Sequence, residues 1–238
     1  VHEFNLITGD LDELPSELKD DAYESDIKYI RSLAQEAIIN DPALGSSNAM
    51  PGAQEGQCQM GECQIGNLVA DSIRWRANAD IAMVDGQSLK GPGWAFGLVR
   101  VSDTWNNIPN TRTICTGAIS GLSLLKVLNR SVSDQGSGKA ALLQISGMKV
   151  VYNAELEGSR IVSVRVFDEK EKIFLPLNRF RLYTFATASD LCSSDLSSGS
   201  FLGEQFAIEG EQADITDDEL VQNIVGDYLT QFNDYPYV

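Results

Sequence analysis

Few side chains in this sequence could do catalytic chemistry: one histidine, four cysteines and 34 acidic residues. A Ser-His-Asp triad needs a histidine as its general base, and hydrolysis at a two-metal centre needs a cluster of metal ligands. The only histidine, His2, stands next to the first residue of the sequence, where solvated surface is the expected role. The spacing of the acids singles out no pair for glycoside hydrolysis. The sequence therefore indicates no catalytic residue and no metal site in this chain.

The four cysteines favour a disulfide over a metal site. Cys58 and Cys63 lie five residues apart, and a bond between them would close a short loop in an oxidising compartment. A structural zinc ion needs four ligands, and only Cys115, Cys192 and His2 remain to complete a set. We expect a Cys58–Cys63 disulfide. Cys115 and Cys192 could pair or stay buried as small apolar side chains.

The charge excludes a nucleic-acid-binding surface. The net charge is −16, and no Lys or Arg follows Arg181, whereas eleven Asp and Glu do. Such a surface repels phosphates, while nucleic-acid binding relies on basic patches. A highly soluble secreted or halotolerant surface is expected, with weak Ca²⁺ binding by carboxylates as the alternative. No run of about 18 apolar residues predicts a transmembrane helix. An extracellular, periplasmic or cell-surface location is therefore expected.

The first 57 residues are interpreted as an N-terminal extension. Residues 3–9 predict a short strand, residues 10–24 an acidic linker, and apolar residues at spacings of three and four predict a helix over 25–40. Residues 41–56, rich in Pro, Gly and Ser, are expected to form a loop. The first residues show neither the basic region nor the apolar run of a signal peptide, so the N-terminus is interpreted as a cut in a longer chain or a matured end.

Residues 58–238 predict one α+β domain with a mixed sheet flanked by helices, because helical and strand-like segments follow each other without strict alternation. Ser120 is expected to cap the second helix, and Thr216 and Glu219 to form a capping box before the last. Gly158 and Ser159 predict the turn of an antiparallel hairpin. The expected helices are 66–77, 120–128 and 216–229; the expected strands are 80–84, 113–116, 141–145, 148–152, 161–167 and 180–188.

The aromatic residues allow two interpretations. Trp75 lies on a helix face and is expected in the core. Trp94 and Phe96 lie in the glycine-rich segment 91–97, which is expected to be a loop. An exposed loop of this kind is a candidate contact surface for a partner or a flat ligand, although core packing is the favoured interpretation.

Five motifs in the same order resemble the C-terminal, substrate-recognition domain of the 5'-nucleotidase family. They are CQMGECQIGNLVADS at 58–72, ADIAMVDGQSLK at 79–90, a helix that begins with glycine at 117–128, LLQISGMKVVY at 142–152 and TDDE at 216–219. The resemblance spans about residues 58–228 and implies that family's mixed α/β fold. It also implies that residues 1–40 correspond to the last strand of a metallophosphoesterase domain and an interdomain helix. The two divalent metals and catalytic groups of the family would then belong to a missing upstream domain.

The resemblance also implies a nucleotide-binding site, but this chain departs from its pattern. Gln59 stands where many members of the family have an arginine. Asp85 stands where the family has an asparagine, and Lys90 where it has an arginine. Asn110 stands where one base-stacking phenylalanine is expected, and the position of the other falls near Ala188. Each lost ring removes about 1–3 kcal/mol of stacking. We expect nucleotide binding to be weak or lost. The family positions implied for substrate binding are Gln59, Asp85, Lys90, Asn110, Ser146, Gly147 and Asp195.

Two functions remain in competition. The first is a non-catalytic structural or binding module of a larger secreted protein or assembly, which needs a protein partner or the missing upstream domain. The second is the substrate-recognition half of a secreted, metal-dependent phosphoesterase. A carrier of a small ligand near Asp85, Lys90 and Asn110 is a third possibility.

Overall fold

The computed structural model describes Lys28, Tyr29, Ser32 and residues 41–51, 56–108, 112–133, 142–192, 214–217 and 219–231. The chain divides into two compact units, Val1–Pro42 and Ala43–Val238. In the first unit Lys28, Tyr29 and Ser32 are helical, within the helix expected over 25–40. The expected strand at 3–9 and the linker at 10–24 lie outside the described residues. The domain boundary expected at residue 57 stays a prediction.

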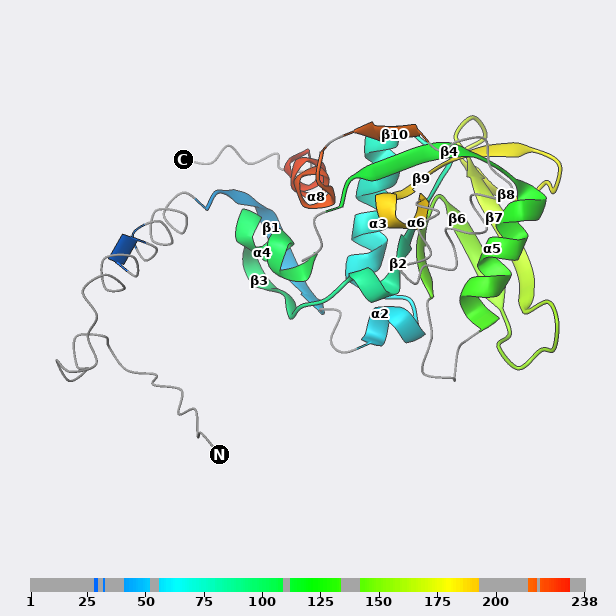
Figure 1. Cartoon of the computed structure of the whole chain (residues 1–238), viewed down its shortest axis with the longest axis horizontal. Coiled ribbons are helices and arrows are strands. Elements are labelled where there is room, and N and C mark those ends of the chain that lie inside the picture. Colours follow the sequence, from blue (N-terminus) through cyan, green and yellow to red (C-terminus); the bar gives the residue numbers. More distant parts are fainter. Residues whose placement is uncertain are drawn as a thin grey trace. The chain divides into compact units, whose positions relative to one another are not determined.

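The second unit contains helices and strands in mixed order (Figure 1). In chain order they are β1 (Ala43–Pro51), α2 (Gln57–Met60), α3 (Gln64–Ala77), β2 (Ile81–Asp85), the 3₁₀ helix η4 (Gly86–Ser88), β3 (Gly93–Arg100), α4 (Val101–Asn107), β4 (Ile114–Ser120), α5 (Gly121–Ser133), β5 (Leu143–Ser146), β6 (Met148–Tyr152), β7 (Ile161–Asp168), β8 (Ile173–Pro176), β9 (Leu182–Ala188), α6 (Ser189–Cys192), β10 (Asp214–Asp217) and α8 (Val221–Thr230).

A five-stranded mixed sheet forms the centre of this unit, in the order β10-β4-β9-β2-β5. β2 and β9 are parallel, and the other neighbours are antiparallel. A three-stranded antiparallel sheet, β6-β7-β8, and a two-stranded sheet, β1-β3, lie beside it. The fold is therefore the α+β fold, with a mixed sheet and helices, that the sequence predicts.

Two apolar clusters form on the two faces of the central sheet, because successive strand residues point to opposite faces. Ala82 and Val84 of β2 belong to the cluster that includes α3 and α8, whereas Ile81 and Met83 belong to the cluster that includes α5, β6 and β7. The sheet is thus covered by helices on one face and by a helix and the small sheet on the other. Strand β5 is left at one edge.

Most of the expected elements between residues 64 and 188 are confirmed, since local signals are strong there. Helix α3 matches the helix expected at 66–77. The Ser120 hydroxyl oxygen accepts a hydrogen bond from the Ser123 N–H at 3.1 Å, so the expected cap of α5 forms. The hairpin β6-β7 also forms, with Gly158 at positive φ between its strands.

Other local predictions are wrong. The segment 41–56 contains strand β1, and the glycine-rich segment 91–97 contributes to β3, because the two segments pair with each other across about 50 residues. Such pairing overrides the loop-like composition of both segments. The expected capping box at 216–219 does not form. Residues up to Asp217 belong to β10, and α8 begins at Val221 after Leu220, which makes no side-chain cap. Strand β8 and helix α4 were not predicted.

Candidate functional site

The loop closed by Cys58 and Cys63 is anchored to the sheet by one buried side chain. The expected disulfide forms. Gln144 of β5, only 1% exposed, donates hydrogen bonds from Nε2 to the carbonyls of Cys58 (2.7 Å) and Gly61 (2.8 Å). Its Oε1 accepts one from the Cys63 N–H at 3.0 Å. A Cβ at Gly66 would lie 2.3 Å from Gln144 Cγ, so glycine permits this close approach. Gln144 therefore fixes the loop against β5.

A second disulfide joins Cys115 of β4 to Cys192 of α6. The sequence leaves this pairing open, and the structure decides it. Cys115 is fully buried, and the bond ties α6 to the sheet next to the end of β9.

The structure brings two predicted site residues, Gln59 and Asp85, to one corner of the domain. Asp85 ends β2, and Gln59 lies in α2 directly after Cys58. A Cβ at Gly86 would lie 1.9 Å from the Cys58 carbonyl oxygen, so η4 packs directly on the backbone of α2. Lys90 follows η4 by two residues and is exposed.

The electrostatics of this corner depend on Asp85. Its Oδ1 accepts a hydrogen bond from the Gln87 N–H at 2.9 Å. Burial raises the pKa of the Asp85 carboxyl above its usual value, against the lowering effects of the Gln87 hydrogen bond and of the Arg112 charge. The protein thus places a poorly solvated carboxyl where the resemblance implies a neutral amide, and its ionised form disfavours a bound phosphate.

A small cavity of about 10 Å³ lies close to this corner. Its lining includes Val84, Ser88, Arg112 and Ala188, but not the predicted residues Gln59, Asp85 and Lys90. That volume holds about one water molecule, whereas sites for small organic ligands usually measure about 300–1,000 Å³. Ala188, near the expected second ring position, is 4% exposed and pairs with Ile114 in the sheet. The predicted residues Asn110 and Asp195 lie outside the described residues.

Ser146 and Gly147 lie toward the other end of β5. Asp85 pairs with Leu143, whereas Ser146 pairs with Ala82. Three residues along a strand correspond to about 10 Å. The structure therefore separates these two predicted residues from Gln59 and Asp85.

Hydrogen bonds and close packing hold the turn at Ser146 and Gly147. The Ser146 hydroxyl donates to Asp71 Oδ1 at 2.5 Å and accepts from Arg74 Nε at 2.9 Å, which joins the turn to α3. Gly147 has φ of 76°, and a Cβ there would lie 2.2 Å from the Asp80 carbonyl oxygen. Substrate contact by Ser146 or Gly147 stays a prediction.

The part of the chain that the structure describes contains no group of three or more His, Cys, Asp or Glu that could hold a metal ion. Within the same residues, no helix is both long and apolar enough to span a membrane.

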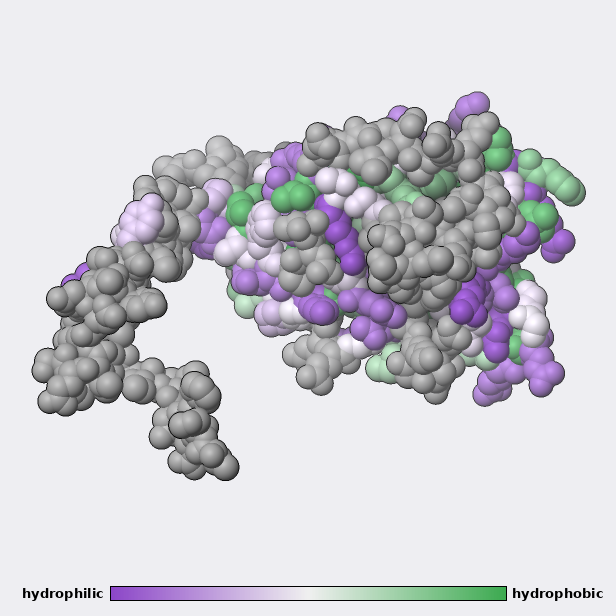
Figure 2. All heavy atoms as spheres, viewed as in Figure 1, coloured by the Kyte–Doolittle hydropathy of each residue, from purple (hydrophilic) through white to green (hydrophobic). Residues whose placement is uncertain are grey.

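The aromatic residues divide between core and surface. Trp94 is buried, at 5% exposed, and its Nε1 donates to the Asp103 carbonyl at 3.3 Å, whereas Phe96 two residues later is 80% exposed. Trp75, expected in the core, is 37% exposed, and its ring centroid lies 5.7 Å from that of Tyr228. On the face drawn in Figure 2, hydrophobic and hydrophilic residues are interspersed.

Sequence reasoning missed Gln144, Asp71, Arg74 and Arg112. Gln144 had a detectable signal, since it is the one polar residue in the run Leu142–Ile145 and a buried amide requires hydrogen-bond partners. The other three lie far along the chain from the groups they face, so the sequence alone contains no signal for them.

Comparison with known proteins identifies similar sequences. The family model described as 5'-nucleotidase, C-terminal domain, matches residues 43–194. Snake venom 5'-nucleotidase from Macrovipera lebetinus is 27% identical over 190 residues, which cover 72% of this chain and 44% of that protein. The Naja atra protein of the same name is 26% identical over 189 residues, or 72% of this chain and 34% of that protein. The chain thus spans less than half the length of these relatives.

Solved structures share the fold. The 5'-nucleotidase precursor from Thermus thermophilus has a TM-score of 0.72 at 19% identity, over 89% of this chain and 41% of that one. The NAD nucleotidase of Haemophilus influenzae has a TM-score of 0.68 at 16% identity, over 88% of this chain and 39% of that one.

Proposed function

Because the chain belongs to the 5'-nucleotidase C-terminal domain family, we propose that it is a non-catalytic binding module of a larger secreted protein or assembly, with a weakened nucleotide site. The observation that carries this proposal is the corner at Asp85. A poorly solvated carboxyl stands there, at the position where the resemblance implies an amide. The charge of its ionised form opposes a bound phosphate.

Lys90 does not compensate for these changes. Its ammonium keeps a positive charge but lacks the planar fork with which arginine binds phosphate in two places. The side chain is exposed, so solvent weakens its attraction for an anion. The only histidine of the sequence, His2, supports the non-catalytic part of the proposal, because one histidine provides little for a two-metal centre.

A second candidate function is favoured by the length of the relatives. The chain covers 44% of one venom 5'-nucleotidase and 34% of another. In this second proposal the chain is the substrate-recognition half of a metal-dependent phosphoesterase, and the two metal ions belong to an upstream domain. Both proposals place the chain outside the cytoplasm, at the cell surface, in the periplasm or in the extracellular space. The two disulfides and the venom origin of the relatives support that location.

Titration calorimetry with AMP and adenosine tests the weakened nucleotide site. The expected result is a dissociation constant of about 1 mM or higher for both ligands. This corresponds to a binding free energy no more favourable than about −4 kcal/mol. Asp85→Asn restores the amide and is expected to strengthen AMP binding, while Asp227→Asn on α8 serves as a control for loss of one charge. Micromolar binding by the unaltered chain would overturn the proposal.

The protein isolated from its source separates the two candidates. The non-catalytic module predicts no release of phosphate from AMP in the presence of divalent metal ions, whatever the length of the native chain. The phosphoesterase half predicts a mass well above the 26.0 kDa of this chain and AMP hydrolysis that EDTA abolishes.

A further inference from the structure

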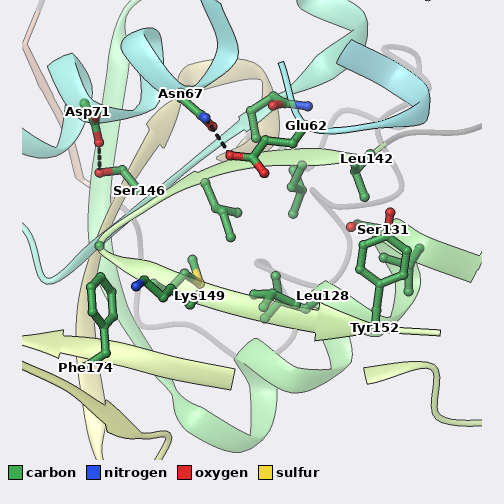
Figure 3. A pocket seen from close by; sticks show the side chains of 17 residues that line it. Glu62, Asn67, Asp71, Leu128, Ser131, Leu142, Ser146, Lys149, Tyr152 and Phe174 are labelled. Atoms are coloured by element: carbon green, nitrogen blue, oxygen red, sulfur yellow. Dashed lines mark hydrogen bonds between the residues drawn. The ribbon is translucent and has the colours of Figure 1, made fainter. Parts of the chain in front are cut away.

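A larger cavity lies beside β5, at the edge of the central sheet, and its lining includes Ser146 and Gly147, two of the residues predicted for substrate binding. β5 is the edge strand of the five-stranded sheet, and β6 is the edge strand of the three-stranded sheet. The two strands diverge after the turn at Gly147, and the cavity of about 720 Å³ lies between them. Figure 3 shows Glu62, Asn67 and Asp71 on one side and residues of α5, β6 and β8 opposite.

The size and lining of this cavity suit a small organic molecule. Its volume lies within the range of about 300–1,000 Å³ that is usual for such sites. Most of the wall is apolar, and two aromatic side chains contribute to it. The apolar and aromatic residues are Leu128, Val132, Leu142, Leu143, Ile145, Met148, Val150, Tyr152 and Phe174.

One hydroxyl in the wall is left without a partner by the described residues. Ser131 of α5 is 2% exposed and lines the cavity. Among the residues that the structure describes, none forms a hydrogen bond with its side chain, although Ser133 two residues later donates to the Arg130 carbonyl at 2.7 Å. The Ser131 oxygen is not among the buried side-chain atoms that lack a partner, so it is open to the cavity and available to a ligand.

The carboxylate of Glu62 favours a cation. Its Oε1 accepts from Asn67 Nδ2 at 2.7 Å, and no described residue donates a hydrogen bond to its second oxygen. The carboxylate of Asp71 also lines the cavity, but it accepts from the Ser146 hydroxyl, which in turn accepts from Arg74 Nε, so a positive charge already lies close to Asp71.

Lys149 is the single basic residue among the described residues of the lining, and its ammonium lies 4.3 Å from the centre of the Phe174 ring. The described lining therefore holds two carboxylates and one ammonium.

We propose that this cavity binds a small organic cation with an apolar body. The body packs between α5 and the diverging strands, the ammonium lies beside Glu62, and the Ser131 hydroxyl supplies one hydrogen bond. The site is separate from the corner at Asp85, so it does not depend on the proposed function. The nucleotide titration and the experiment below test different residues.

Tryptamine and indole-3-acetate are suitable probes, because they share the indole body and carry opposite charges. Both are titrated into the ¹⁵N-labelled full chain, and amide shifts are followed. The expected result is saturable binding of tryptamine, with the largest shifts at Ser131, Ser146 and Lys149, and at least tenfold weaker binding of indole-3-acetate.

Two conservative variants test the polar contacts. Ser131→Ala is expected to weaken tryptamine about fivefold, the size expected for one neutral hydrogen bond. Glu62→Gln is expected to weaken it about threefold, because an exposed ion pair contributes little. The matched controls are Ser133→Ala, on the same helix, and Glu157→Gln, whose exposed carboxylate lies outside the cavity lining. Neither control should change the affinity.

Any of four results would overturn the proposal, and the first three concern binding by the unaltered chain. These are no saturable binding of tryptamine at millimolar concentration, equal or tighter binding of the anion, and shifts that gather away from β5 and α5. Equal losses in Glu62→Gln and Glu157→Gln would show only a general charge effect and would also overturn it.

Discussion

Replacement of Gln144 by leucine tests how the disulfide loop is held to the sheet. The buried amide makes three hydrogen bonds, at 2.7, 2.8 and 3.0 Å, all to the backbone of residues 58–63. Leucine keeps a similar volume but leaves two carbonyls and one N–H without this partner. Since each net hydrogen bond contributes about 1 kcal/mol, the free energy of unfolding should fall by about 3 kcal/mol.

Urea denaturation followed by circular dichroism measures this change, and the midpoint should fall without a change of slope. For a domain of this size the melting temperature should fall by about 6–12 °C. Gln64→Leu is the control, because Gln64 is an exposed residue of α3 near the same loop. A loss below about 1 kcal/mol in Gln144→Leu, or an equal loss in the control, would refute the view that the amide anchors the loop.

Three further predictions rest on single side chains. Burial raises the pKa of Asp85 in the folded state. The contribution of this carboxyl to stability is therefore present at low pH and is lost as pH rises through that pKa. In urea denaturation, Asp85→Asn should be more stable than the parent at pH 7 and about equal to it at pH 3. Gly147→Ala should lose about 2–3 kcal/mol in the same assay, because it places a Cβ at positive φ and 2.2 Å from a carbonyl oxygen; an unchanged midpoint would contradict the packing described. Trp94→Ala should lose about 3–5 kcal/mol because the ring is buried, whereas Phe96→Ala should change stability by less than about 0.5 kcal/mol; similar losses in both would contradict the placement of β3.

Local signals in the sequence were sufficient for much of the fold. The 3.6-residue spacing of apolar side chains located α3, and a serine before a helical pattern located the start of α5. Both signals act over a few residues, so they are readable without the rest of the molecule. The order of five motifs likewise predicted the family that the comparison shows.

The sequence did not predict the pairing of strands that lie far apart in the chain. β1 and β3 lie about 50 residues apart, and the composition of both segments predicts loops. They form a sheet because each supplies the other's backbone hydrogen bonds. The start of α8 was misplaced for the same reason, since pairing with β4 draws residues up to Asp217 into β10.

The candidate sites show the same division. The sequence by itself determined which residues stand at Gln59, Asp85 and Lys90, and hence which charges are available. Only the tertiary structure decided that Gln59 and Asp85 share a corner, that Ser146 and Gly147 lie toward the other end of β5, and that a cavity opens where β5 and β6 diverge. Burial, cavity volume and hydrogen-bond partners arise from contacts between distant segments, and the order of residues along a chain does not record them.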